Sequence, residues 1–588
     1  MAKKIMSKDK QYLDKLRHSA SHLLAAAVLE IWPKAKPTLG PSIEDGFYYD
    51  FDFGDEKVSE DDLEKIESKM KDLVKNWQGF QGQEVSKEDA KDQFKNNEYK
   101  LELIDEHSQD GGQLTFYKSG EFLDLCRGGH VENPSKELKH FRLLSVAGAY
   151  WRGDEKNKML TRIYGTAFES KKELAEYLHM KEEAKKRDHR KLGKELDLFA
   201  FSDLVGSGLP LFTPKGTVIR DELEAYVASL NKKYGYQKVW IPHLAKPDLY
   251  KTSGHWDKFK DDLFHVKGAD DEFVIKPMNC PHHTQIYASK ARSYRDLPIR
   301  LYETTTVYRD EQSGQLGGLT RVRCITQDDG HSFIRPDQVE EEFKTLLTIQ
   351  RKVLESVGLT DYWISLSLRD PKNKEAYLGD DKVWEEAQNT MRVILDKLKI
   401  TYKPIEGEAA FYGPKMDLMA KDSIGREWQL STIQLDFNMP ARFKLKYADK
   451  DGHNKQPIMI HRAFLGSTER FIGLLIEHFT GAFPLWLSPV QIQVIPVGEG
   501  HIEYSQKLAD EFKELGLRAQ VDNASETVGN KIRKTTQQKI PYALVVGDKE
   551  INSGKLMIRK RGQKDQFELS KIDFIKQVEE EIKDKVIW

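Results

Sequence analysis

The chain has 588 residues, of which 39% are hydrophobic and 32% are charged. This length exceeds what one hydrophobic core organises, and the composition is typical of a folded globular protein rather than a disordered one. With 92 basic and 94 acidic residues the net charge is -2, so binding of nucleic acid must rest on local patches. No apolar run approaches the roughly 18 residues of a membrane span, and the start lacks a secretory signal. We therefore expect a cytoplasmic protein without a membrane partner.

Four segments follow one another along the chain. The first, residues 1–168, opens with the helical "DKLRHSASHLLAAAVLEIW" and closes with the strand-like "LTRIYGTAF". Apolar residues at helical spacing within dense charge then predict an exposed linker helix over 169–187. A large mixed region, 188–488, precedes a simple alternation of strands and helices over 489–588. That alternation predicts a small α/β module with a mainly parallel sheet.

The first segment carries two pairs of candidate functional residues. His18 and His22 are four apart, which on a helix places both imidazoles on one face, about 5 to 6 Å apart. Cys126 and His130 are also four apart, and Asp124 lies beside them. Either pair alone is more simply a polar helix face or a glycine turn. Together they indicate a site that holds a metal or activates water.

The stretch "KPMNCPHHTQIY" places Cys280 directly before Pro281 and two histidines. The chain has only three cysteines, which cannot form a disulfide framework. In a reducing compartment such a cysteine is a candidate thiolate ligand or catalytic group, and a buried inert thiol is the simplest alternative.

Arginines surround a glycine-rich turn in "VYRDEQSGQLGGLTRVRCITQDDGHSF", where Arg309 and Arg321 flank Glu311. Guanidinium groups stay charged and bind phosphate oxygens in a bidentate manner, although a solvated hairpin fits equally well. Further along, His461 lies on a predicted strand and Arg470 starts an apolar helix, a place that also favours phosphate.

The motifs resemble those of class II aminoacyl-tRNA synthetases. "KVWIPHL" with Pro242, "VYRDEQSG" and "GSTERFIG" are similar to the three class II motifs. "KPMNC", "TQDDGH", "EAAFYGPK", "STIQLDF" and "MIHRA" resemble the threonyl-tRNA synthetase family over nearly the whole chain. The resemblance implies an α+β multidomain protein: an α/β editing domain (1–168), a catalytic antiparallel sheet flanked by helices (188–488) and an α/β anticodon-binding domain (489–588).

The resemblance also implies a reaction. An ATP-dependent ligase of this family joins L-threonine to threonine tRNA, works as a homodimer through the first motif, and uses one Zn²⁺ per subunit and Mg²⁺ with ATP. Zinc would bind the hydroxyl and amino groups of threonine together, which the near-isosteric valine cannot imitate. The implied residues are Cys280, His331 and His461 for zinc; Gln327, Asp329 and Tyr412 for threonine; Arg309, Glu311, Arg321, Gln429, Gln434 and Arg470 for ATP, with Arg309 and Arg470 catalytic.

Serine would pass this filter, because it keeps both groups and lacks only a methyl, a difference worth about 1 to 3 kcal/mol. The family therefore hydrolyses seryl-tRNA in a second site, and it reads the anticodon with its last domain. The residues implied are His18, His22, Lys100, Asp124, Cys126 and His130 for editing, and Arg533, Glu550 and Arg559 for the anticodon.

The chain departs from the family pattern at several positions. His18 lies too near the start for the additional ubiquitin-like domain that many members carry, so we expect a form without it. Ile325 replaces an aromatic that stacks on adenine, at a loss of about 0.5 to 1.5 kcal/mol. Ser525 stands where asparagine is common, and His282 replaces a glycine. Two alternatives stay open: a class II synthetase of other specificity, such as prolyl or seryl, and a non-catalytic RNA-binding regulator.

Overall fold

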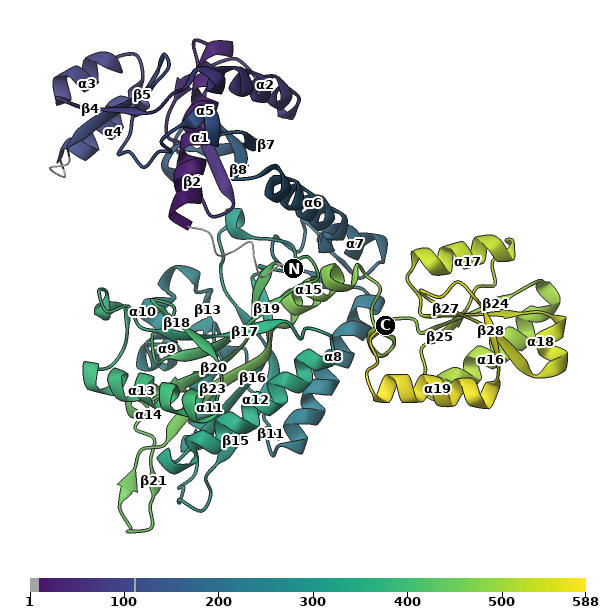
Figure 1. The fold of residues 1–588 in the computed structure, drawn as a ribbon. Helices are drawn as coiled ribbons and strands as arrows, with labels where there is room; N and C mark the ends of the chain where they lie inside the picture. Colours follow the sequence, from purple (N-terminus) through teal and green to yellow (C-terminus); the bar gives the residue numbers. More distant parts are fainter. Residues whose placement is uncertain (1–9, 110–112) are drawn as a thin grey trace. The chain divides into compact units, whose positions relative to one another are not determined.

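A computed structural model describes residues 10–109 and 113–588 of the chain (Figure 1). The chain divides into two compact units, the first ending at Glu183 and the second beginning at Ala184. Within the described residues, no helix combines the length and apolar character needed to span a membrane.

The first unit is built around α1 (Lys10–Ile31), which confirms the predicted opening helix. Its buried residues Leu16, Ala20, Leu23 and Ala27 recur every three or four positions, so one face of the helix is apolar. This face packs on β3 (Gly46–Asp52) and β8 (Met159–Phe168) of an antiparallel sheet. The other elements of this unit are β1 Lys36–Pro37, β2 Ser42–Ile43, α2 Leu63–Leu73, β4 Gln81–Val85, α3 Lys87–Gln93, α4 Glu98–Gln109, β5 Leu114–Ser119, β6 Phe122–Leu125, α5 Pro134–Glu137 and β7 His140–Tyr150.

A helix, α6 (Lys171–Arg187), occupies the predicted linker, and a separate short helix, α7 (His189–Glu195), follows it. Asp188 separates the two helices. Its carboxylate accepts a hydrogen bond from the backbone N–H of Arg190 (2.8 Å). Asp188 therefore ends one helix and caps the next, because an aspartate at this position satisfies a free N–H of the first turn.

The second unit contains, among the described residues, an eight-stranded sheet in the order β11-β15-β16-β23-β20-β19-β17-β18. Adjacent strands are antiparallel except at the two edges, where β11 pairs with β15 and β17 with β18 in parallel. The antiparallel catalytic sheet implied by the resemblance is thus confirmed. The strands are β11 Gln237–Lys238, β15 Ile299–Tyr308, β16 Cys324–Ile334, β17 Tyr362–Leu368, β18 Tyr402–Glu406, β19 Lys415–Lys421, β20 Glu427–Asp436 and β23 Ile458–Ser467.

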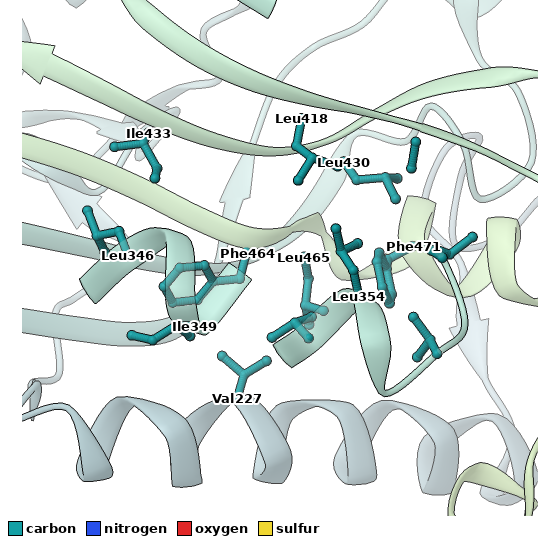
Figure 2. Close-up of a cluster of buried hydrophobic side chains, with 14 of the residues drawn as sticks. Val227, Leu346, Ile349, Leu354, Leu418, Leu430, Ile433, Phe464, Leu465 and Phe471 are labelled. Atoms are coloured by element: carbon teal, nitrogen blue, oxygen red, sulfur yellow. The ribbon is translucent and has the colours of Figure 1, made fainter. Parts of the chain in front are cut away.

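One face of this sheet packs against helices to form the main core of the unit. Figure 2 shows Leu346, Ile349 and Phe464 in this core, with Val227 on a helix below them. The remaining elements of this part are β9 Phe199–Ala200, β10 Leu211–Phe212, α8 Pro214–Lys233, β12 Leu244–Ala245, α9 Pro247–Ser253, α10 His255–Lys258, β13 His265–Lys267, β14 Glu272–Ile275, α11 Cys280–Ala288, α12 Val339–Glu355, α13 Asp381–Lys397, α14 Asn438–Arg442, β21 Tyr447–Ala448, β22 Asn454–Lys455 and α15 Thr468–Phe479.

A buried ion pair joins the two central strands on the core side of the sheet. The Arg462 guanidinium, on β23, donates to the backbone carbonyl of Asp328 on β16 and to Asn231 Oδ1 on α8 (2.7 Å). The Asp328 carboxylate accepts the backbone N–H groups of Phe464 and Leu465, both at 2.9 Å. Burial raises the pKa of Asp328 to about 6. The pair therefore fixes β16 against β23 and ties both to α8.

The last part of the second unit is a five-stranded sheet, counted over the described residues, in the order β25-β24-β26-β27-β28. Its first pairs are parallel as predicted, but β27 and β28 run antiparallel to their neighbours. Only residues 547–554 connect β26 to β27, too few for a parallel crossover of a dozen or more residues. The elements are β24 Ile492–Pro496, α16 Ile502–Glu514, β25 Ala519–Val521, α17 Val528–Gln537, β26 Tyr542–Val546, α18 Asp548–Ser553, β27 Lys555–Lys560, β28 Phe567–Ser570 and α19 Lys571–Lys583.

Replacing Arg462 with Met should destabilise the second unit, because the Asp328 carboxylate stays buried without its cationic partner. Breaking a buried pair in this way costs about 3 to 5 kcal/mol of unfolding free energy. Urea denaturation of R462M, beside Arg351→Met as a control that removes an exposed arginine from α12, measures the effect. Equal losses in the two variants would contradict the role of the pair.

Candidate functional site

Three buried side chains of the second unit converge on one point. Cys280 is the first residue of α11, His331 lies on β16 and His461 on β23. His331 and His461 are direct partners across the antiparallel pair, so their imidazoles stand side by side on one face of the sheet. One ligand atom from each of the three residues lies within 4.8 Å of the others. The fold therefore joins residues that are 51 and 181 positions apart in the sequence.

The surroundings of these residues fit a zinc site. His461 Nε2 pairs with Asp436 Oδ2 (2.9 Å), while His461 Nδ1 is buried without a hydrogen-bond partner among the described residues. His331 Nδ1 pairs with His283 Nδ1 (2.7 Å), which leaves Nε2 available. A second ring nitrogen held by a hydrogen bond is the usual arrangement of a metal-ligating histidine. One sulfur and two nitrogen donors suit zinc and leave an open coordination position.

Burial also raises the pKa of the Cys280 thiol, with the Asp329 and Asp436 charges adding to the effect. The described contact of its sulfur is His255 Nε2 at 3.6 Å, a distance typical of a weak interaction. A thiol that is hard to ionise by itself becomes a thiolate when it coordinates a metal. Cys280 thus lacks the environment of a free nucleophile.

The residues expected to contact threonine lie around this cluster. Asp329 precedes His331 by two residues, so both side chains point to the same face of β16, and its Oδ2 accepts from Asn279 Nδ2 (3.0 Å). The Tyr412 ring stacks on the His461 ring with centroids 4.7 Å apart. The Tyr412 hydroxyl donates to Gln434 Oε1. Gln327 lies two residues before Asp329 on the same face.

A cavity of about 380 Å³ lies next to Gln327 and collects most of the residues expected to bind ATP. Gln434 is not among its lining residues, and its amide is hydrogen-bonded to Tyr412 and Thr432. Ile325 lines the wall, as expected for a residue that replaces an adenine-stacking aromatic. The residues of the cavity that were implied by the resemblance are Arg309, Glu311, Arg321, Gln327, Gln429 and Arg470.

The cationic groups of this cavity are held in place from several sides. The Arg309 guanidinium contacts Met278 Sδ (3.1 Å) and lies 4.9 Å from the centroid of the Phe259 ring. Arg470 donates from Nε to the Thr320 carbonyl (3.0 Å), and Arg321 pairs with Glu311 (2.6 Å). Burial lowers the pKa of both Arg309 and Arg470. Such partly desolvated cations favour an anionic ligand.

The first unit brings its two predicted residue pairs together. His18 and His22 lie on α1, while Cys126 and His130 lie on the loop after β6. His18 Nε2 is 3.1 Å from Cys126 Sγ, and Cys126 Sγ is 3.3 Å from His130 Nε2. His18, His22 and Cys126 open on a cavity of about 1120 Å³, whereas His130 packs behind them against Phe80.

Burial sets the protonation of this cluster. It lowers the pKa of His18 and of His22, and it lowers the pKa of His130 to about 2. It raises the pKa of Cys126 to about 11. At neutral pH the three imidazoles are therefore uncharged, and Cys126 is a thiol. The four residues also satisfy the distances of a metal site.

Lys100 and Asp124 form a buried pair at the wall of the same cavity, with 2.5 Å between Nζ and Oδ1. Tyr49 completes the pair: its hydroxyl donates to Asp124 Oδ2 (2.5 Å) and accepts from Lys100 Nζ (3.3 Å). Burial raises the pKa of Tyr49 well above its usual value, so the phenol stays protonated. The sequence offered no motif for Tyr49, since it belongs to an aromatic strand whose other members fill the core.

The predicted anticodon contacts lie on the last part of the second unit. Arg533 is exposed on α17 and donates to Asn530 Oδ1 (2.9 Å from Nη2). Glu550 Oε2 accepts the backbone N–H of Gly547 (2.9 Å), so one oxygen of this carboxylate caps α18. Arg559 and Ser525 are exposed.

Several residues that support the sites had no distinctive sequence signal. Asp436 contacts the His461 ring, His283 contacts the His331 ring, and Asn279 donates to Asp329. Asp436 lies inside the family motif "STIQLDF", but the motif by itself does not indicate the contact of this carboxylate with His461. His282, which replaces a glycine, is buried with neither ring nitrogen hydrogen-bonded within the described part of the chain. Nothing in the structure explains this substitution.

Comparison with known families divides the chain in the same order as its motifs. A family described as the class II core domain of tRNA synthetases (G, H, P, S and T) matches residues 263–479. An anticodon-binding domain matches residues 491–581. The second additional domain of threonyl- and alanyl-tRNA synthetases matches residues 114–164, around Cys126 and His130.

Solved structures of threonyl-tRNA synthetases also resemble the chain, and two of them are described below. One is described as the RNA binding domain of threonyl-tRNA synthetase from Cryptosporidium parvum, with 36% identity and a TM-score of 0.64 over 67% of this chain and 98% of that one. The other is a putative threonyl-tRNA synthetase from Aeropyrum pernix, with 29% identity and a TM-score of 0.61 over 68% and 96%.

Similarity to curated proteins extends over nearly the full length. Threonine–tRNA ligase of Cytophaga hutchinsonii is 50% identical over 570 residues, which cover 96% of this chain and 88% of that protein. The enzyme of Staphylococcus aureus is 49% identical over 574 residues, or 97% and 88%. Because half of the residues are shared across almost the whole sequence, the chain belongs to the threonyl-tRNA synthetase family.

Proposed function

We propose that this member of the family activates L-threonine with ATP, transfers it to the 3′ end of threonine tRNA, and hydrolyses seryl-tRNA in a separate site. The observation that carries the proposal is the shared face of β16. Gln327 on this face lines the cavity with Arg309 and Arg470, while His331, four residues on, belongs to the buried Cys/His/His cluster. A nucleotide and a metal-bound amino acid can therefore meet on one strand.

Cys280, His331 and His461 are proposed to hold one Zn²⁺ per subunit. When bound, the metal would supply a Lewis acid that takes the hydroxyl and amino groups of threonine together and rejects valine. Asp329 is proposed to accept a hydrogen bond from the threonine hydroxyl, and the position of its Oδ1, 3.6 Å from His331 Nε2, supports this role. Gln327 and Tyr412 are proposed to position the amino group.

In the activation step, a carboxylate oxygen of threonine attacks the α-phosphorus of ATP, and the bond to pyrophosphate breaks. Negative charge grows on the phosphate oxygens, and Arg309 is proposed to stabilise it at the α-phosphate. Arg321 and Arg470 are proposed to hold the outer phosphates, which arrive with Mg²⁺. Glu311 is proposed to accept from the adenine amino group, with Gln429 and Gln434 nearby. No side chain is needed as a nucleophile.

In the editing step, water attacks the ester carbonyl of seryl-tRNA, and the ribose oxygen of the terminal adenosine leaves with a proton. The neutral imidazoles of His18 and His22 are suited to accept a proton from this water. Cys126 and His130 complete the cluster, while the Lys100–Asp124 pair, held by Tyr49, offers a fixed charge pattern to the substrate. These proposed roles are supported by the large cavity that His18, His22, Cys126, Lys100 and Asp124 line.

The remaining roles follow the domain organisation proposed from the sequence: editing over 1–168, a linker over 169–187, catalysis over 188–488 and anticodon binding over 489–588. Arg533, Glu550 and Arg559 are proposed as anticodon contacts, because unpaired bases of a loop can be read by charged side chains. The exposure of Arg533 and Arg559 supports this.

We further propose a homodimer formed through the first class II motif. β11 lies at the edge of the eight-stranded sheet, and Trp240, just after it, is 77% exposed. An open strand edge beside an exposed tryptophan is a suitable surface for a second copy. We also propose that the protein is located in the cytoplasm, because free cysteines, of which it has three, are typical of that reducing compartment.

Arg309→Ala should lower kcat/KM for threonine-dependent pyrophosphate exchange by about 10² to 10³-fold, because the α-phosphate loses its preorganised cation. Arg295→Ala, which removes a fully exposed arginine of the same unit, should leave the rate unchanged. If the wild-type protein shows no exchange with threonine, the proposed reaction is wrong.

Cys280→Ser should reduce bound zinc from about one equivalent per chain to a small fraction, since a serine hydroxyl is a poor zinc ligand. Elemental analysis of purified protein measures the metal independently of activity. Cys324→Ser, at a cysteine outside the cluster, is the matched control and should retain zinc. A full zinc content in C280S would exclude this cysteine as a ligand.

Cys126→Ala and His18→Ala should slow hydrolysis of seryl-tRNA by about a hundredfold or more, because water loses the groups that position it or accept its proton. Threonine activation should not change. A deacylation assay with preformed seryl-tRNA tests this, with Cys324→Ala as control. Unchanged deacylation of seryl-tRNA in both variants would show that Cys126 and His18 are not editing residues.

A further inference from the structure

A buried histidine outside the described sites touches the loop that lines the nucleotide cavity. His189 begins α7, and its Nε2 accepts the backbone N–H of Leu319 at 3.0 Å. Leu319 belongs to the segment 309–323, here called the nucleotide loop, which also contains Arg309 and Arg321. Both His189 and Leu319 are buried.

The other ring nitrogen of His189 is also committed. Nδ1 lies 2.7 Å from Glu477 Oε1, and the backbone N–H of His189 donates to the same oxygen (3.1 Å). Because a carboxylate only accepts and a backbone N–H only donates, the imidazole must carry its proton on Nδ1 and present a lone pair at Nε2. Asp188, His189 and Glu477 cluster closely enough for a metal, but this ring has no lone pair left to offer one.

The nucleotide loop is tightly packed against the His189 imidazole. A methyl group added at Gly318, which has φ +56°, would lie 2.3 Å from His189 Nε2. A methyl at Gly473 of α15 would lie 3.2 Å from Leu319 Cβ and 3.6 Å from His189 Cδ2. The hydrogen bond to Leu319 therefore holds the loop at a single distance from α7 and α15.

The fixed backbone leads directly into the nucleotide cavity. Thr320, the next residue, lines the cavity, and its carbonyl accepts from Arg470 Nε at 3.0 Å. Two successive residues, Leu319 and Thr320, thus connect His189 on one side with Arg470 on the other. A shift of the Leu319 backbone would move the acceptor that orients the Arg470 guanidinium.

Glu477, the partner of His189 Nδ1, is itself held by charged neighbours. Glu477 Oε2 accepts from the Arg426 guanidinium, and Arg426 also pairs with Asp422 (2.7 Å). Asp422 in turn accepts the backbone N–H groups of Ile424 and Arg426 in the turn between β19 and β20. His189 is therefore supported by a chain of charged groups that does not itself reach the nucleotide.

We propose that His189 is a positioning residue for ATP, which acts by fixing the Leu319–Thr320 backbone and through it Arg470. The inference rests on the proposed function of the cavity. Its role is selective for the nucleotide, because none of its described contacts is a residue of the Cys/His/His cluster or a predicted threonine contact.

Two substitutions test the two hydrogen bonds of the His189 imidazole, to Leu319 and to Glu477, one at a time. An asparagine amide can reproduce Nδ1–H, so H189N keeps a donor for Glu477 but loses the acceptor for Leu319. A glutamine amide reaches the position of Nε2, so H189Q keeps an acceptor for Leu319. His453→Asn, at an exposed histidine of the same unit, is the matched control.

Pyrophosphate exchange at varied ATP and varied threonine gives both KM values. We expect H189N to raise the KM for ATP by about three- to tenfold, the equivalent of one hydrogen bond, with the KM for threonine unchanged. H189Q and H453N should stay within about twofold of wild type. An equal rise in both KM values, or the same rise in H189Q as in H189N, would overturn the proposal, since a loss of general stability does not select ATP.

Hydrogen–deuterium exchange of peptides covering 316–322 tests the bond without catalysis. Faster exchange in H189N than in H189Q supports the anchoring of Leu319, and equal exchange overturns it. If the wild-type protein lacks threonine-dependent exchange of pyrophosphate, the proposed function fails, while this measurement still decides whether His189 fixes the loop.

Discussion

The pairing of β16 with β23 is the constraint on which the sites of the second unit depend. A strand alternates its side chains, so β16 sends Gln327, Asp329 and His331 to one face and Asp328 to the core, and the register with β23 is continuous from Asp329 onward. A shift by one residue would exchange the two sets. The buried bond network between Asp328 and Arg462 opposes such a shift, because it leaves no partner for either charge in another register. Core packing and ligand geometry are therefore set by the same pair of strands.

Buried histidines differ across the molecule in the groups that contact their ring nitrogens. At His461 a carboxylate holds Nε2 and leaves Nδ1 free, whereas at His189 a carboxylate holds Nδ1 and directs the lone pair of Nε2 to a peptide group. In the editing cluster, His18, His22 and His130 are kept neutral by burial rather than by a carboxylate partner. The environment of each ring thus decides whether it suits a metal, a backbone or a proton.

Local patterns predicted much of the fold, but only a part of the sites. The helical spacing of α1, the exposed linker helix and the last alternating module could be recognised because neighbouring residues determine them. Cys280, His331 and His461 could be grouped only through family resemblance, since strand register pairs the two histidines and tertiary packing brings the start of α11 to them. Tyr49 and His189 gave no signal at all: an aromatic strand and a polar helix start are common, and their contacts lie 75 and 130 residues away. The antiparallel β27 was missed because connection length, not alternation, decides strand direction.

Gly330 shows how little space the packing between β16 and Arg462 leaves for a side chain. It lies on β16 between Asp329 and His331, and a methyl group at its Cα would sit 2.3 Å from the Arg462 guanidinium carbon. The backbone there is not strained, so the demand for glycine is purely one of volume. Any larger residue must displace the Arg462 guanidinium from its hydrogen bonds to the Asp328 carbonyl and Asn231. A position that offers no ligand atom can thus constrain the strand pair that carries His331 and His461, and a survey confined to the candidate ligands would overlook it.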